Sequence, residues 1–169
     1  MRPQDIVILL KILILHRETW QFKDLAQQLL LSPAEISESL NRSHLAGLVD
    51  ETKRRVNRLN MVEFICYGLH YVFPQAPGAL VNGIPTAHAH PHFETRIRAE
   101  LKYVWPAPES KARGLAIEPL YPSLPKAAAQ DEELYLLLAC IDMVRVGRQR
   151  EVNMATDLIQ KKILNEPSK

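Results

Sequence analysis

The chain has little of the material that several classes of enzyme need. Its six glycines are scattered over 169 residues, so it has no glycine-rich loop that would hold phosphate groups, and no nucleophile elbow. The two cysteines, Cys66 and Cys140, lie in apolar, helix-like stretches. We therefore expect buried thiols rather than the disulfide framework of a small secreted protein. These absences predict that the protein is not an enzyme.

Excess charge and long hydrophobic runs are also missing. A formal net charge of +2 does not indicate nucleic acid by itself, so the positions of the charges must decide. The longest apolar run, residues 6–15, is interrupted by Lys11 and has about half the length that spans a bilayer. No small-residue cleavage site follows it. We expect a buried first helix in a cytoplasmic protein.

The residues that are present divide the chain into three regions. Helical patterns fill residues 1–72 and return in residues 131–164. Residues 73–130 hold nine of the 12 prolines and are therefore predicted to be mostly loop with short extended pieces. The expected fold is mainly α with a small β component, in which a C-terminal pair of helices follows the proline-rich middle segment.

Apolar periodicity and capping residues predict the individual helices. Their expected ranges are residues 3–16, 22–30, 32–46, 57–70, 131–147 and 149–163. The third helix has the clearest start, because Ser32 and Glu35 form a capping box with Pro33 at the first helical position. Gly47 is typical of a helix end.

The second and third helices are joined by a turn so short that they must cross steeply, as in a helix-turn-helix. We expect Ile36, Leu40 and Leu45 of the third helix to face the core. The residues expected to point outward are Ala34, Glu35, Ser37, Glu38, Asn41 and Arg42. Asn41 and Arg42 suit bidentate reading of adenine and guanine, and Ser32 and Ser37 suit phosphate contacts.

A basic run follows at the place where a winged helix has its wing. Lys53, Arg54, Arg55 and Arg58 lie within six residues that contain no acid. Each phosphate that such side chains neutralise releases counterions and adds affinity. We therefore predict phosphate contacts for these four residues. The alternative is that the run is only a solvated face.

The stretch from Ser32 to Val49 resembles the recognition helix and helix exit of MarR-type winged-helix regulators. The resemblance covers about a third of the chain and implies a dimer that binds short palindromic sites in double-stranded DNA. The wing is shorter here, and Glu35 and Glu38 place acid near the groove. Residues 1–72 are therefore predicted to form a winged helix-turn-helix with a following long helix.

The proline-rich middle segment resembles a group of little-characterised bacterial winged-helix proteins. The similar stretches are residues 71–74, 83–88, 104–106 and 119–122. Proteins of this group lie beside genes for nucleotidyltransferase-type toxins, so the resemblance implies an antitoxin or an autorepressor with a toxin as partner.

A histidine cluster is the one candidate for site chemistry. In an extended strand, His88, His90 and His92 share a face and could converge on a divalent metal ion, with Glu94 as a fourth ligand. The alternatives are an ordinary polar loop and a segment that responds to pH or to a ligand.

Two functions of different class follow from these observations. The first is a transcriptional regulator, a repressor or autorepressor, that occupies a promoter as a homodimer. The second is an interaction module, an antitoxin or adaptor, that binds and masks another protein.

Overall fold

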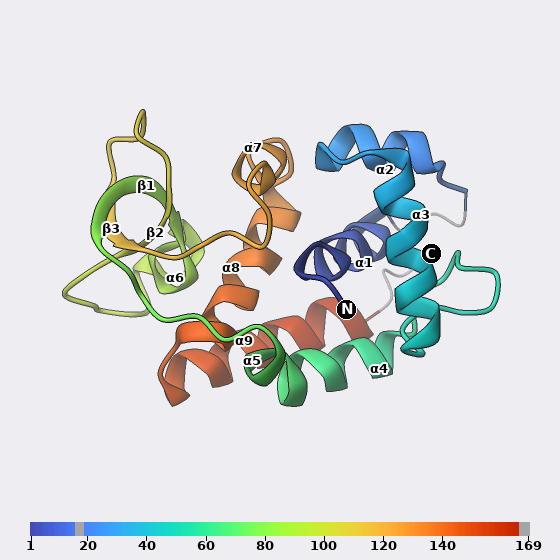
Figure 1. The fold of residues 1–169 in the computed structure, drawn as a ribbon. Coiled ribbons are helices and arrows are strands. Elements are labelled where there is room, and N and C mark those ends of the chain that lie inside the picture. The colour runs from blue at the N-terminus through green and yellow to red at the C-terminus, as the bar shows by residue number, and fades with distance from the viewer. Residues whose placement is uncertain (16–18, 166–169) are drawn as a thin grey trace.

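The computed structural model describes residues 1–15 and 19–165. It is mainly helical, with 57% of the residues in helices, and it has a small mixed sheet of three strands. Figure 1 shows this sheet on one side of the molecule and the first three helices on the other, with α8 between them. The mainly α fold with a small β component is therefore confirmed, whereas the sheet lies in the middle of the chain.

The helices lie close to their predicted ranges. The first half of the chain contains α1 (Pro3–Leu15), α2 (Phe22–Leu29), α3 (Pro33–Leu45), α4 (Arg58–Glu63), the π-helical turn η1 (Phe64–Gly68) and α5 (Leu69–Val72). The second half contains the 3-10 turn η2 (Ala87–Ala89), α6 (Pro91–Glu94), α7 (Leu124–Ala128), α8 (Glu132–Val146) and α9 (Gln149–Leu164). The predicted end of the first helix, His16, lies outside the described residues.

Side-chain caps, of which the Ser32–Glu35 capping box was predicted, set the starts of three helices. The Ser32 hydroxyl accepts a hydrogen bond from the Glu35 amide at 3.2 Å, and the Glu35 carboxylate accepts one from the Ser32 amide at 2.9 Å. Asn57 caps α4 and Asp131 caps α8 in the same way. Side-chain oxygens thus satisfy amides that have no partner inside the helix.

The strands come from the proline-rich segment. They are β1 (Leu80–Thr86), β2 (Tyr103–Pro106) and β3 (Arg113–Ala116). β1 pairs antiparallel with both β2 and β3, and β2 and β3 pair in parallel, so the three strands close into a small barrel. This closure requires Gly83, because a Cβ atom there would lie 2.2 Å from the Trp105 carbonyl oxygen.

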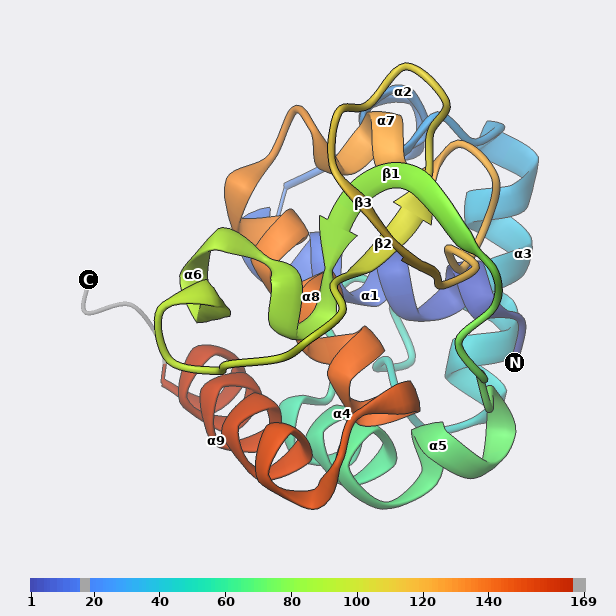
Figure 2. The ribbon, with the colours of Figure 1, turned by 90° about the vertical axis from the view of Figure 1, so that its left-hand side faces the viewer.

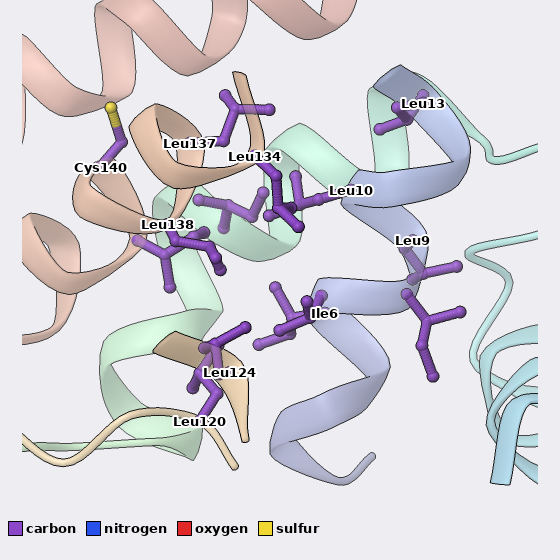
Figure 3. Packing of buried hydrophobic residues seen from close by; sticks show 14 of the residues in the cluster. Ile6, Leu9, Leu10, Leu13, Leu120, Leu124, Leu134, Leu137, Leu138 and Cys140 are labelled. Atoms are coloured by element: carbon purple, nitrogen blue, oxygen red, sulfur yellow. The ribbon is translucent and has the colours of Figure 1, made fainter. Parts of the chain in front are cut away.

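One hydrophobic core joins the three regions of the sequence. α1 is buried almost all round, and Ile6 through Leu10 are fully inaccessible. In Figure 3, Ile6 and Leu10 of α1 lie against Leu134 and Leu138 of α8, with Leu120 and Leu124 beside them. α1 and α8 therefore form the centre of the molecule, as expected of helices that are apolar on most sides.

Polar contacts reinforce this core at the points where distant segments meet. Lys11 interrupts the apolar sequence of α1. Its ammonium group pairs with Asp131, at the start of α8, at 2.6 Å. The Tyr121 hydroxyl donates to the Leu29 carbonyl at 2.9 Å, which fixes the proline-rich segment to the end of α2. No helix in residues 1–15 and 19–165 is both long enough and apolar enough to cross a membrane.

Candidate nucleic-acid interface

The candidate interface begins with α3, which packs on α1 and α2. Leu30 adopts a left-handed conformation with φ 54° at the end of α2, and α3 starts three residues later at Pro33. Ile36 and Leu40 are fully buried, as predicted. The prediction that Leu45 faces the core is wrong, because Leu45 is 90% exposed. Nine residues at about 100° each place Leu45 on the side opposite Ile36.

The inward positions near Leu45 belong to serines instead. Ser39 and Ser43 are fully buried, and they complete the three- and four-residue spacing with Ile36 and Leu40. The outward surface of α3 consists of the exposed residues Ala34, Glu38, Asn41, His44 and Leu45, with Ser37 half-buried beside them.

Arg42 was predicted to point outward. In the structure it is half-buried, and its guanidinium group binds Asp5 of α1. Nε donates to Asp5 Oδ2 at 3.0 Å and a terminal nitrogen donates to Oδ1 at 2.7 Å. Asp5 is fully buried, and its Oδ2 also accepts from the Arg2 amide at 2.7 Å. Burial raises the pKa of Asp5, but the Arg42 and Arg2 hydrogen bonds outweigh it and leave the pKa below its ordinary value. Arg42 thus anchors α3 to α1.

A short hairpin follows α3 at the place predicted for a wing. Val49 and Val56 form an isolated antiparallel bridge, and the Asn57 amide donates to the Leu48 carbonyl at 2.8 Å. Asp50 organises the loop, since its Oδ1 accepts from the amides of Arg54 at 2.9 Å and Arg55 at 3.1 Å. The hairpin of residues 48–57 is the teal loop beside α3 in Figure 1.

The basic side chains of this hairpin differ in the groups that they contact. Lys53 donates from Nζ to Asn41 Oδ1 at 2.6 Å, which joins the hairpin to the outward face of α3. Arg54 and Arg55 are both exposed. Arg54 lies 4.7 Å from the centre of the Trp20 ring and donates to the Trp20 carbonyl at 2.6 Å. Arg58 donates to the Ile163 carbonyl of α9 at 2.6 Å.

The aromatic support of Arg54 was not predicted. Trp20 and Phe22 stack at 5.7 Å before and at the start of α2, and the Arg54 guanidinium lies over both rings. A guanidinium on aromatic faces is a favourable pair. The sequence contains these three residues, but Arg54 and Trp20 are 34 positions apart, so their contact could not be predicted from local spacing.

The three histidines do not share the face of a strand, because the segment is helical. His88 lies in the 3-10 turn η2 and His92 in α6. His88 Nε2 lies 2.9 Å from the Leu101 carbonyl, while His90 Nδ1 accepts from the His92 amide at 3.1 Å. Lys102 binds Glu94, the proposed fourth ligand, at 2.7 Å. In the part of the chain that the structure describes, no group of three His, Cys, Asp or Glu side chains is placed to hold a metal ion.

A buried polar network, which was not predicted from the sequence, joins α8 to the sheet. Asp142 Oδ2 accepts from the Thr86 hydroxyl and from Trp105 Nε1, each at 2.7 Å, and Oδ1 accepts from Arg145 at 2.8 Å. Burial raises the pKa of Asp142, and its three donors oppose that rise. Arg145 also donates to the Phe73 carbonyl at 3.1 Å, so it joins α8 to the end of α5 as well.

Comparison with known proteins adds no relative to these observations. Neither family models, nor curated proteins, nor solved structures gave a match to this chain.

Proposed function

We propose that the protein is a transcriptional regulator, a repressor or autorepressor, that binds double-stranded DNA as a homodimer. In this proposal α1–α3 and the hairpin of residues 48–57 form a winged helix-turn-helix with a shortened wing. The observation that carries the proposal is the contact between Asn41 and Lys53. It places a side chain suited to adenine edges beside the cation-rich hairpin, on the exposed side of one helix.

The contacts with DNA would divide by chemistry. With α3 in the major groove, Asn41 can accept from and donate to adenine, and Ser37 and His44 lie on the same helix. Lys53 and Arg55 would meet the phosphates beside the groove. The hydrogen bond between Asn41 and Lys53 is exposed, so breaking it costs about 1 kcal/mol at most, and DNA can replace both partners.

Arg54 and Arg58 have supporting roles in the proposal. Because each donates to a backbone carbonyl, they hold the hairpin and the start of α4 in place. Arg42 has the same kind of role through Asp5. Direct phosphate contact is proposed for Lys53, which lies beside Asn41 of α3, and for the exposed Arg55.

The test is fluorescence anisotropy with a duplex from the protein's own upstream region and with a random duplex, at several salt concentrations. Lys53→Ala with Arg55→Ala should weaken binding to both duplexes and make the salt dependence shallower by about two units of slope. Asn41→Ala should cost about 1–3 kcal/mol on the preferred duplex and much less on the random one. Arg96→Ala with Arg98→Ala, a basic pair in the loop before β2, is the matched control.

A second candidate is the interaction module, an antitoxin or adaptor with a toxin as partner. The observation that favours it is the mixed character of the outward face of α3, where Leu45 is 90% exposed and Glu38 carries an acid. Such a face suits a protein better than a phosphate backbone. If the wild-type protein binds neither duplex at low salt, this candidate replaces DNA binding.

A further inference from the structure

The helix formed by α4, η1 and α5 buries one side and exposes the other. Met61, Ile65 and Leu69 are fully buried. Ile159 and Ile163 of α9 are also buried, with exposed fractions of 0% and 1%. The apolar faces of this helix and of α9 are therefore used inside a single chain. α4 and α5 lie at the lower edge of the molecule in Figure 2.

That outer side is unusually rich in large apolar side chains. Tyr67 is 76% exposed, Tyr71 82% and Leu59 65%. With Glu63, which is also exposed, they form the α4–α5 stripe (Leu59, Glu63, Tyr67 and Tyr71). Together with the neighbouring Val72, the stripe exposes roughly 500 Å² of apolar side chain, more than half of the ~800 Å² that each partner contributes to a standard interface.

The π-helical turn η1 is what makes the stripe straight. In an uninterrupted α-helix, residues 59 and 71 would point about 120° apart, since each residue advances about 100°. The wider turn over Phe64–Gly68 advances each residue by only about 80°, which returns Tyr67 and Tyr71 to the direction of Leu59. π-helical turns are rare and are frequent at functional sites. This turn therefore aligns Leu59, Tyr67 and Tyr71, with Glu63 between the first two, along one edge of the helix.

Two polar side chains of this helix, Glu63 and His70, are arranged symmetrically. Its carboxylate, Glu63, and the exposed imidazole of His70 lie at equal distances from the midpoint between residues 66 and 67. His70 Nδ1 lies 3.0 Å from the Arg145 carbonyl, which leaves the outer ring nitrogen for another partner. In an antiparallel pair of such helices with a two-fold axis at that midpoint, Glu63 lies at the level of the partner's His70.

We propose that the α4–α5 stripe is the interface with a second copy of this chain, packed antiparallel about a two-fold axis next to Tyr67. An isologous interface presents the same patch twice, so it must complement itself. A stripe that carries two tyrosines and one carboxylate, with one imidazole beside it, meets that requirement. The proposal specifies the dimer of the proposed function, but it is independent of DNA binding and is tested without DNA.

Light scattering at micromolar concentration is the first measurement. The wild-type protein should have the mass of a dimer, and Tyr67→Gln with Tyr71→Gln should halve it, because glutamine keeps the helix but removes the aromatic surface. Leu101→Gln removes an apolar side chain that is 49% exposed in the loop before β2, and this control should leave the mass of a dimer. Circular dichroism checks that each variant is folded.

Cross-linking locates the axis independently. Tyr67→Cys should give a disulfide-linked dimer under mild oxidation, because the axis brings the two copies of residue 67 together, whereas Leu101→Cys should not. A monomeric wild-type protein would overturn the proposal, and so would a dimer that survives both tyrosine substitutions. A dimer through the stripe that binds no DNA would support this interface and refute only the proposed function.

Discussion

At the scale of the residue, the pair of Arg42 and Asp5 shows how one contact changes the expected role of a side chain. From the sequence, Arg42 is an outward-facing arginine suited to guanine. In the structure both oxygens of a fully buried carboxylate accept from its guanidinium. The sequence cannot reveal this, because the two partners are 37 positions apart and Asp5 also suits the first turn of α1.

The pair makes a prediction about stability. Arg42→Ala should lower the free energy of unfolding by about 2–4 kcal/mol, because it leaves the buried Asp5 carboxylate without its cation. Urea denaturation at neutral pH measures this loss. The double variant Asp5→Ala with Arg42→Ala is the control and should lose less than the sum of the two single variants. Losses that simply add would show that the two side chains do not interact energetically.

At the scale of the element, local signals were predictable and long-range ones were not. The capping box of α3, the caps of α4 and α8 and the prolines at helix starts depend on residues at most four positions apart. The barrel of β1, β2 and β3 depends on pairings between distant strands, and nothing in the proline-rich segment fixes their order. Leu45 is exposed because it lies nine residues after Ile36, and the helical period turns it to the opposite side of α3.

The turn into α6 gives a prediction about pH. His90 is the N-cap of this helix, and its Nδ1 accepts a hydrogen bond from the His92 amide only while Nδ1 carries no proton. Burial, with a smaller effect of His92, lowers the pKa of His90 to about 4. His90 therefore takes up a proton near pH 6.5 in the unfolded chain but only near pH 4 in the folded chain. Stability should fall as the pH decreases through that window.

His90→Asn separates this effect from general acid denaturation. Asparagine caps a helix with its side-chain oxygen but takes up no proton in this range. Unfolding followed at pH 7 and at pH 5 should show a smaller loss of stability in the variant than in the wild-type protein. An equal loss in both proteins would place the pH dependence elsewhere.

At the scale of the whole molecule, the three regions of the sequence behave as parts of one core. α1 packs against α3 on one side and α8 on the other, and Lys11 ties it to the start of α8. The Asp142 network then joins α8 to the sheet. We therefore expect cooperative unfolding of the whole chain, although its composition divides it at residues 72 and 130.

The two tryptophans make this expectation measurable, because Trp20 lies next to α2 and Trp105 lies in β2. Trp20→Phe leaves fluorescence that reports on the sheet, and Trp105→Phe leaves fluorescence that reports on the α1–α3 end.

In each variant, the urea midpoint from fluorescence should coincide with the midpoint from circular dichroism, which follows all the helices. Trp105→Phe also removes a donor to the buried Asp142 carboxylate, so its midpoint should be lower than that of the wild-type protein. The comparison is therefore made between the two signals within each variant. Midpoints that separate in either variant would show that the α1–α3 end and the sheet unfold independently, and the candidate interface would then be a domain of its own.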